Sequence, residues 1–296
     1  MMMTPQIRRL EPADLPVLEA FLQPRLASSM FLLGNARDGA LHAGEGRPRG
    51  VYMAAFEEGA LVGVVAQFWN GYIIPQAPRH LDTLWRAVVR ESGRDVVGVN
   101  GPGAQAFAVV DAIGMTPADC LMYSRENLYR LDLDVLIVPP ALADGRVRGR
   151  PLAASDLDTV ARWFAAYSME ALHEEDSPRL HVEARARAEY NLEQAITWVV
   201  EVEGELVAMS SFNTRLAEAV QIGGVYTPPA LRGRGHARAA VAQSLLDARA
   251  HGAGTAILFT GDDDTAADRA YRALGFQVVG DYAIVYFRTP VAAAEI

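Results

Sequence analysis

The sequence has 296 residues, of which 51% are hydrophobic and 21% are charged. This balance is typical of a globular protein with one large or two ordinary domains. The net charge of −9 argues against binding to a nucleic-acid backbone. No segment reaches the roughly 18 uncharged apolar residues of a membrane span, and the first residues lack the apolar core of a secretory signal. Because Cys120 is the only cysteine, no intrachain disulfide can form, and we expect a reducing, cytoplasmic location.

The first half of the chain predicts a strand, a helix and a hairpin, in that order. Apolar residues before Asp14 indicate a short strand, and this carboxylate can cap the helix that continues to Phe21. Two apolar runs then flank the turn at Glu58 and Gly59, which is typical of a β-hairpin. A further helix is expected to end at Gly114.

The same plan returns in the second half and indicates an internal repeat. The strand and capped helix recur around Asp156 at an offset of 142, the hairpin turn recurs at Glu203 and Gly204 at 145, and the helix end recurs at Gly275 at 161. Short apolar matches also arise by chance, but these three fall in the same order. The second copy carries extra residues between its hairpin and its last helix. A segment rich in Pro, Gly and Arg at 139–150 predicts domains at residues 1–140 and 146–296.

The extra stretch holds the most distinctive motif of the chain. An apolar strand, 219–226, is interrupted by Gly223 and Gly224, which suggests a bulge or the close approach of a ligand. A Gly- and Arg-rich turn, 232–238, then leads into a helix with a small, apolar face that ends near Gly252. The free N–H groups and the dipole of a helix start bind anions, and glycine lets the backbone approach a phosphate. An ordinary basic turn is the alternative, and the spacing fits dinucleotide and nucleoside-triphosphate motifs poorly.

At this point the chain resembles the GNAT superfamily of N-acetyltransferases. The family signature Arg/Gln-x-x-Gly-x-Gly/Ala is met by Arg232, Gly235 and Ala237. The preceding strand is similar to the fourth strand of the family, and residues 268–276 are similar to its fourth helix and the following turn. The resemblance implies an α/β (α+β) fold with two tandem GNAT-like domains. Each would be a mixed, mostly antiparallel sheet flanked by helices, and the N-terminal copy matches only in outline.

The resemblance also implies roles for individual residues. Acetyl-CoA would be the cosubstrate, with its pantetheine arm along the strand and its pyrophosphate on the turn, and no metal is expected. Asp264 stands where the family often has an Asn that contacts the cofactor, and Tyr271 stands where a family Tyr commonly lies near the sulfur. At helical spacing such a Tyr is often only part of a core. The implied cofactor-binding residues are Val225, Tyr226, Thr227, Arg232, Gly233, Arg234, Gly235, His236, Ala237, Arg238 and Asp264.

Acyl transfer to an amine requires a neutral amine, a stabilised thioester oxygen and a protonated leaving thiolate. Backbone N–H groups near Val225 would stabilise the oxygen, and Tyr271, with an ordinary pKa of about 10, would supply the proton. The sequence leaves open which group is the general base that takes the proton from the amine. Some family members use a Glu where this chain has Gln221, and Glu218 is out of register. Water is a further alternative. Another is an acidic cluster, for which a solvated loop is the competing interpretation; it comprises Glu170, Glu174, Glu175 and Asp176. Cys120 lies in the first copy and is not expected to be a nucleophile.

The first copy lacks the phosphate-binding turn, because Pro75 and Pro78 remove amide donors where a phosphate would need them. The Gly-rich segment 99–103 is interpreted as a turn. The favoured function is therefore N-acetyltransfer from acetyl-CoA to a primary amine, by direct attack in a ternary complex at one site. A non-catalytic acyl-CoA-binding regulatory module is the alternative. Nucleic acid and membrane partners are not expected, and an oligomer is possible.

Overall fold

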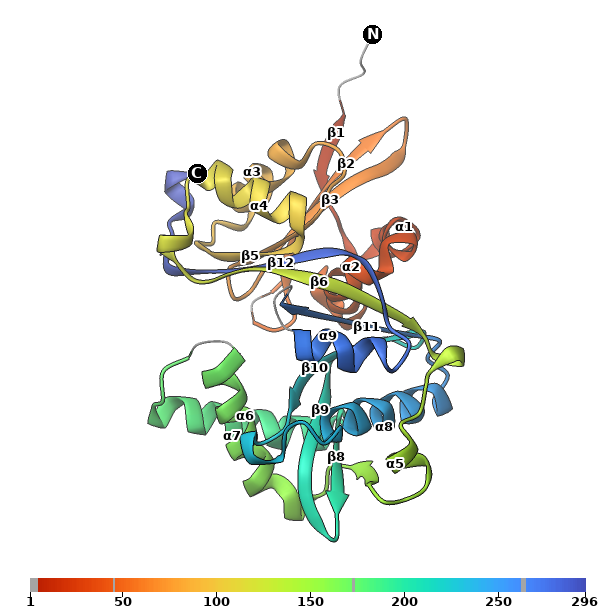
Figure 1. Ribbon diagram of the computed structural model, residues 1–296. Coiled ribbons are helices and arrows are strands. Elements are labelled where there is room, and N and C mark those ends of the chain that lie inside the picture. The colour runs from red at the N-terminus through yellow and green to blue at the C-terminus, as the bar shows by residue number, and fades with distance from the viewer. Residues whose placement is uncertain (1–4, 45, 172–173, 262–264) are drawn as a thin grey trace. The chain divides into compact units, whose positions relative to one another are not determined.

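The strands and helices of the chain assemble into two units that exchange segments rather than simply following one another. The computed structural model describes residues 5–44, 46–171, 174–261 and 265–296 (Figure 1). Unit 1 consists of residues 1–128 and 279–296, and unit 2 consists of residues 129–278. The chain therefore leaves unit 1 once and returns to it for its last strand.

Unit 1 is a mostly antiparallel sheet with helices against it. Its strands lie in the order β1-β2-β3-β4-β5-β12-β6. The pairs β1–β2, β2–β3, β3–β4 and β5–β12 are antiparallel, whereas β4 and β5 are parallel. Its elements are β1 (Gln6–Arg9), α1 (Leu15–Leu22), α2 (Leu26–Asn35), β2 (Gly50–Glu57), β3 (Ala60–Phe68), β4 (Tyr72–Gln76), α3 (Leu81–Ser92), β5 (Val96–Pro102), α4 (Gly103–Ile113), β6 (Cys120–Asp132) and β12 (Gln277–Val291).

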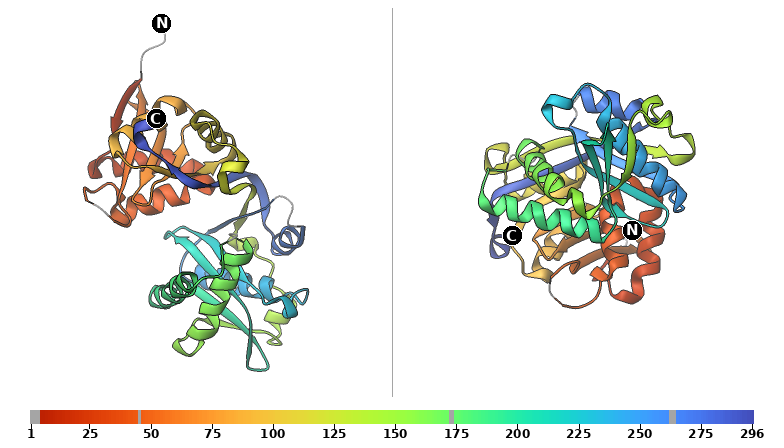
Figure 2. Two further views of the ribbon diagram at one scale, coloured as in Figure 1. Left: turned by 90° about the vertical axis from the view of Figure 1, so that its left-hand side faces the viewer. Right: turned by 90° about the horizontal axis from the view of Figure 1, so that it is seen from below.

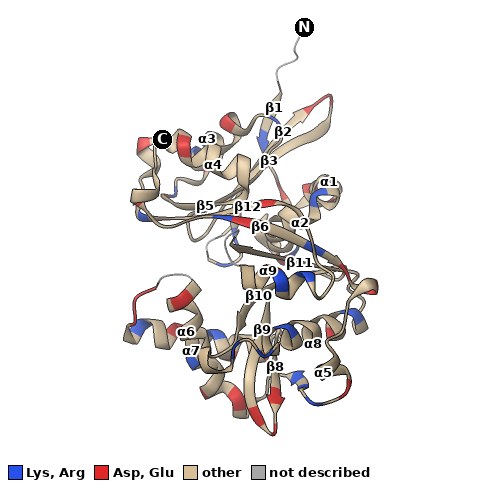
Figure 3. Ribbon diagram, in the orientation of Figure 1, with Lys and Arg blue, Asp and Glu red and all other residues tan. Residues whose placement is uncertain are grey.

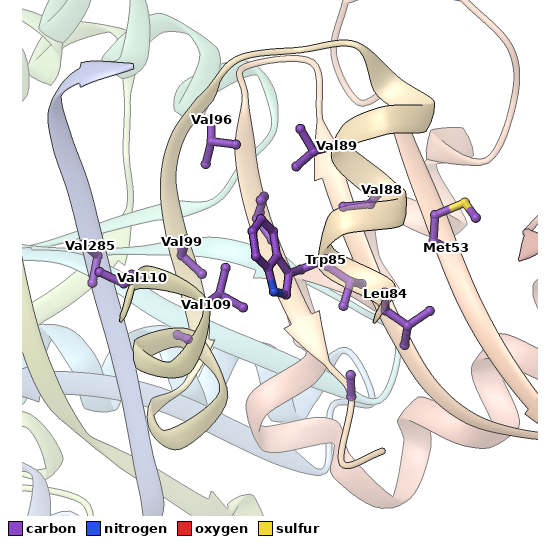
Figure 4. Packing of buried hydrophobic residues seen from close by; sticks show 14 of the residues in the cluster. Met53, Leu84, Trp85, Val88, Val89, Val96, Val99, Val109, Val110 and Val285 are labelled. Carbon is purple, nitrogen blue, oxygen red and sulfur yellow. The ribbon is translucent and has the colours of Figure 1, made fainter. Parts of the chain in front are cut away.

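The core of unit 1 explains why α3 lies where it does. Four buried residues of α3 (Leu84, Trp85, Val88 and Val89) follow the three- and four-residue spacing of one helix face. They pack against valines of β5 and α4, with Val285 of β12 in the same cluster (Figure 4). Burying each of these side chains contributes about 1.5–3 kcal/mol, so the last strand of the chain is fixed into unit 1 by its packing as well as its pairing.

Unit 2 repeats the arrangement. Its strands lie in the order β6-β11-β10-β9-β8-β7. The pair β10–β11 is parallel, whereas the pairs β9–β10, β8–β9 and β7–β8 are antiparallel. Val199 faces α6 and α7, whereas its neighbours Trp198 and Val200 face α8, so helices cover both sides of the sheet (Figure 2). Its elements are α5 (Pro140–Ala143), β7 (Arg148–Pro151), α6 (Leu157–Ala171), α7 (Pro178–Glu193), β8 (Thr197–Val202), β9 (Glu205–Arg215), β10 (Ala219–Tyr226), α8 (His236–Ala250), β11 (Thr255–Gly261) and α9 (Thr265–Arg272).

Shorter helical turns connect these elements. These turns are Pro12–Asp14, Gln23–Arg25, Ala36–Ala40, Pro117–Asp119, Leu133–Val135, Ala154–Asp156, Pro229–Leu231 and Ala293–Glu295.

In the described part of the chain, no helix is both long enough and apolar enough to span a bilayer.

The internal repeat predicted from the sequence is visible in matching contacts. Arg8 pairs with Asp14 at 2.7 Å in unit 1, and Arg150 pairs with Asp156 at 2.6 Å in unit 2, at the predicted offset of 142. In each copy the Asp also accepts a backbone N–H three residues earlier, so it closes the turn before the first helix. Each Arg lowers the pKa of its Asp through a side-chain hydrogen bond.

The hairpin turns and the last helices also correspond. Glu58 and Gly59 have φ values of +50° and +81°, and Glu203 and Gly204 have +53° and +86°, the pattern of a tight hairpin turn. Gly114 follows α4 and Gly275 follows the corresponding α9, both with positive φ. The repeat therefore extends from the first strand to the last helix of each copy.

The boundary between the copies differs from the expected division at 1–140 and 146–296. Strand β12 pairs with β5 from Tyr282↔Pro102 to Tyr286↔Gly98, so residues 279–296 belong to unit 1. Conversely, Tyr129–Asp132, at the end of β6, belong to unit 2, where β6 is the neighbour of β11. The last strand of the second copy thus pairs in unit 1, and the last strand of the first copy ends in unit 2. A local sequence pattern does not indicate which partner a strand takes.

Candidate active site

Strand β10 carries a bulge at its two glycines. Between Gly223 and Tyr226, two residues of β10 face one residue of β9. Gly224 has φ +62°, and a Cβ at this position would lie 3.2 Å from both Phe164 and Arg187. Glycine is thus required both for the backbone conformation and for space. The bulge bends the strand at this point.

Just before this bulge, β10 separates from β11. The parallel pairs run only from Ala219↔Thr255 to Gln221↔Ile257, and within the described residues β10 has no further pair with β11. Within the described residues, the backbone N–H and C=O groups of residues 222–226 therefore have no partner in β11 along the edge that faces it. Such an edge can bind another extended chain by main-chain hydrogen bonds.

The nine residues after β10 lead directly into the start of α8. Gly233 and Gly235 have φ values of +75° and +80°. Gly235 stands at the N-cap of α8 and has no side chain with which to cap it. The first N–H groups of the helix consequently have no partner within the helix, and the dipole adds partial positive charge. The predicted phosphate-binding turn therefore has the backbone geometry that an anion requires.

Buried polar atoms gather around this turn. Within the described residues, Thr227 Oγ1, His236 Nδ1 and Arg238 Nε have no hydrogen-bond partner, although each is buried. Such atoms are normally paired, so their concentration at one helix start is unusual. Burial, followed by the charge of Arg234, lowers the pKa of His236 and favours its neutral form. This donor set fits the oxygens of a pyrophosphate.

Arg232 holds the turn in place. Its Nε donates to the backbone oxygen of Thr227 at 2.9 Å, and its Nη2 donates to Glu170 Oε2 of α6 at 2.6 Å. The hydrogen bond to Glu170 is also the largest cause of the raised pKa of Arg232. The guanidinium lies 5.8 Å from the centre of the Tyr226 ring. Arg232 thus connects the strand end, the turn and α6, a role the sequence motif did not reveal.

Tyr271 reaches the core of unit 2 from α9. Its ring lies 6.1 Å from that of Tyr129 and 5.9 Å from that of Phe276. The Tyr129 hydroxyl donates to Asp268 of α9 at 2.5 Å, which fixes the helix beside β6. Tyr271 and Val225 both pack against the same hydrophobic cluster, so the predicted acid and the bulged strand share one region of unit 2.

The structure identifies no single general base among the expected candidates. Gln221 is buried and donates to the backbone oxygen of Ile222 at 3.2 Å. Glu170 is held by Arg232, and Asp176 lies 2.8 Å from His181. Asp264, one of the residues expected to contact the cofactor, lies outside the described residues.

In unit 1 the corresponding turn is shorter and internally paired. Only residues 77–80 connect β4 to α3. The backbone N–H of Ala77 donates to Gln105 at 2.6 Å, and Glu57 pairs with His80 at 2.6 Å and with Arg79 at 2.5 Å. A carboxylate of the chain itself therefore lies beside Arg79 and His80 at this helix start. The turn of the first copy thus differs from that of the second in both its length and its internal pairing.

Sequence reasoning missed α7 and the arginine it positions at the bulge. Ser177 caps this helix by accepting the N–H of Leu180 at 3.2 Å, and Pro178 is its first residue. A Ser-Pro pair before a helical segment is a recognised start signal, so α7 could have been found. The position of Arg187 beside Gly224 has no such signal, because it depends on the bulge.

Residues 158–276 match the model of the acetyltransferase (GNAT) family. No curated protein matches the sequence at a significant level. A protein of known structure from Drosophila shares 14% identity, with a TM-score of 0.65 over 96% of this chain and 99% of the other. A GCN5-related N-acetyltransferase from Sphaerobacter thermophilus shares 17% identity, with a TM-score of 0.58 over 95% and 94%.

A tandem GNAT protein from the clavulanic acid biosynthesis pathway has the same two-copy architecture. It shares 13% identity with this chain, with a TM-score of 0.54 over 96% of this chain and 98% of the other. At these identities the likeness is one of fold. It extends over both units, as the expected tandem architecture requires.

Proposed function

Because residues 158–276 form a GNAT acetyltransferase domain, we propose that the chain transfers an acetyl group from acetyl-CoA to a primary amine at one site in unit 2. The observation that carries the proposal is the course of β10. Within the described residues the strand has no pair with β11 after Gln221; it bulges at its two glycines and leads into a helix start with Gly235 at the N-cap. Together these features offer an edge for a pantetheine arm and a cluster of donors for a pyrophosphate.

Individual residues take the following roles in this proposal. The backbone of Val225, Tyr226 and Thr227 pairs with the pantetheine arm. The amides of residues 233–238 bind the pyrophosphate, assisted by the unpaired side-chain nitrogens of His236 and Arg238. Arg232 holds the turn closed on Thr227 and Glu170.

The reaction we propose is direct attack of the amine on the thioester, which acetyl-CoA supplies. A carbon–nitrogen bond forms and the carbon–sulfur bond breaks. Backbone N–H groups at the bulge stabilise the carbonyl oxygen, Tyr271 gives a proton to the sulfur, and the amine proton passes to water. Cys120 is no nucleophile in this scheme: it belongs to unit 1, is buried, and has a pKa raised by burial.

Unit 1 contributes no second acetyl-CoA site in this proposal. Its short turn and the carboxylate of Glu57 leave no room for a second pyrophosphate. Unit 1, residues 1–128 and 279–296, is then the degenerate copy, and unit 2, residues 129–278, is the catalytic one. The single buried Cys120 suits a reducing, cytoplasmic environment.

Calorimetric titration with acetyl-CoA tests the site, and release of free thiol in the presence of amines tests the reaction. We expect one site per chain and no binding to Gly235→Glu, whose carboxylate would repel the pyrophosphate. Gly204→Glu is the matched control, because it makes the same change at another glycine of positive φ, in the β8–β9 turn. Two equivalent sites, or unchanged affinity in folded Gly235→Glu, would contradict the proposal. Binding without thiol release from any amine would indicate the non-catalytic module instead.

A further inference from the structure

Arg187 of α7 is a half-buried cation that forms no ion pair within the described residues. Its guanidinium lies 4.4 Å from the centre of the Phe164 ring and 5.9 Å from that of Tyr167. Burial is the largest cause of its lowered pKa, which the charges of Tyr167 and Glu174 partly offset. Within the described residues it forms no ion pair, whereas Arg179 and Arg185 of the same helix pair with carboxylates. A partly accessible guanidinium that no carboxylate of the chain neutralises is available to bind an anion.

The position of Arg187 relates that ligand to the reaction. A Cβ at Gly224, the bulged residue of β10, would lie 3.2 Å from Arg187 Nη2. The proposed pyrophosphate site lies elsewhere, at the start of α8. Helices α6 and α7 pack on one face of the sheet and α8 on the other, so Arg187 is not part of the phosphate-binding turn. It stands at the bulge, where the proposed mechanism places the reacting carbonyl.

We propose that Arg187 binds a carboxylate of the acceptor, so that the acceptor is an amino acid or a compound with the same pairing of amine and carboxylate. This inference rests on the proposed function. A planar guanidinium matches a carboxylate with two parallel hydrogen bonds, and stacking on Phe164 fixes its plane. Acidic residues at the end of α6 and just after it favour an acceptor that also carries a cation (Figure 3). These residues are Glu170, Glu174, Glu175 and Asp176.

The test compares acceptors that differ only in the carboxylate. L-amino acids and their carboxamides are assayed with acetyl-CoA, and phosphoethanolamine represents a phosphate-bearing amine. We expect kcat/KM for amino acids to exceed that for amides by about 10- to 100-fold, as charge-assisted hydrogen bonds imply. Arg187→Gln should remove this preference and leave kcat/KM for the amides within about 3-fold of the wild-type value. Arg185→Gln, two residues away and already paired with Glu189, is the matched control and should change neither.

Each result decides the inference. Equal use of amino acids and amides by the wild-type protein would overturn it, and this measurement requires no variant to fold. A preference for phosphoethanolamine, or transfer to none of the carboxylate-bearing amines, would also overturn it. So would a preference that survives in Arg187→Gln. Acetyl-CoA titration separates this failure from that of the proposed function: intact binding with no carboxylate preference rejects only the role of Arg187.

Discussion

Replacing Gly224 by Ala tests whether the bulge of β10 positions the reaction. The substitution adds one methyl group at a residue with φ +62°. The new Cβ would lie 3.2 Å from Phe164 and from Arg187, so these neighbours must shift by a few tenths of an ångström. The change therefore has two separable effects, which are backbone strain and crowding at the proposed site.

The structure sets a magnitude for each effect. Forcing Ala into the left-handed region costs about 1–2 kcal/mol. In a unit of this size that lowers the melting temperature by about 2–8 °C. A misplacement of 1 Å at a reacting centre costs about 100-fold in rate. A shift of a few tenths of an ångström should therefore lower kcat by about 3- to 10-fold.

Gly204→Ala separates the two effects. Gly204 has φ +86° in the β8–β9 turn, and an added Cβ would meet nothing within 4 Å. Both variants should lose similar stability, measured by thermal unfolding, but only Gly224→Ala should lose turnover in a thiol-release assay. Full turnover in Gly224→Ala, with the same loss of stability as the control, would refute the role of the bulge.

Three further outcomes are expected. Tyr271→Phe should lower kcat by about 100-fold, the low end for a general acid, with little change in KM for acetyl-CoA; full activity would end the acid assignment. Asp156→Asn should cost about 2 kcal/mol in urea unfolding at neutral pH, because it removes a buried charge-assisted pair with Arg150. Since Arg150 lowers the pKa of Asp156 in the folded state, this stability is present above the unfolded pKa of about 3.9 and is lost as pH falls through the folded value, so wild type and variant should converge in acid. Asp14→Asn should cost less, because Asp14 is 18% exposed against 7% for Asp156, and an equal cost would contradict this reasoning.

Much of the fold followed from local patterns in the sequence. Asp14 and Asp156 both close a turn before a helix, as their positions after a short strand predict. The hairpin turns could be predicted from a Glu-Gly pair between two apolar runs alone. The glycine turn before α8 was predicted for the same reason, because the conformation of Gly235 and the start of the helix depend on neighbouring residues. Its binding of a phosphate stays a prediction.

The features that escaped prediction depend on partners far away in the chain. Strand β12 pairs with β5 of unit 1, and nothing in its own residues distinguishes this partner from one in unit 2. Arg187 meets Gly224 only because α7 packs beside a bulged strand. Arg232 looked like a phosphate ligand by its motif, whereas its hydrogen bonds to Thr227 and Glu170 give it a structural role as well.

The contrast between the two copies supports the assignment of the site without reference to any motif. In unit 1 the polar groups around the end of β4 are satisfied: Gln76 accepts from Ser28 and Ser29, each at 3.0 Å, and His80 pairs with Glu57. In unit 2 the equivalent turn holds buried polar atoms without partners in the described residues. Buried polar groups that lack a hydrogen-bond partner destabilise the folded state. A protein that keeps a cluster of them therefore keeps it at a cost in stability. The copy that keeps such a cluster is the one expected to bind a ligand there.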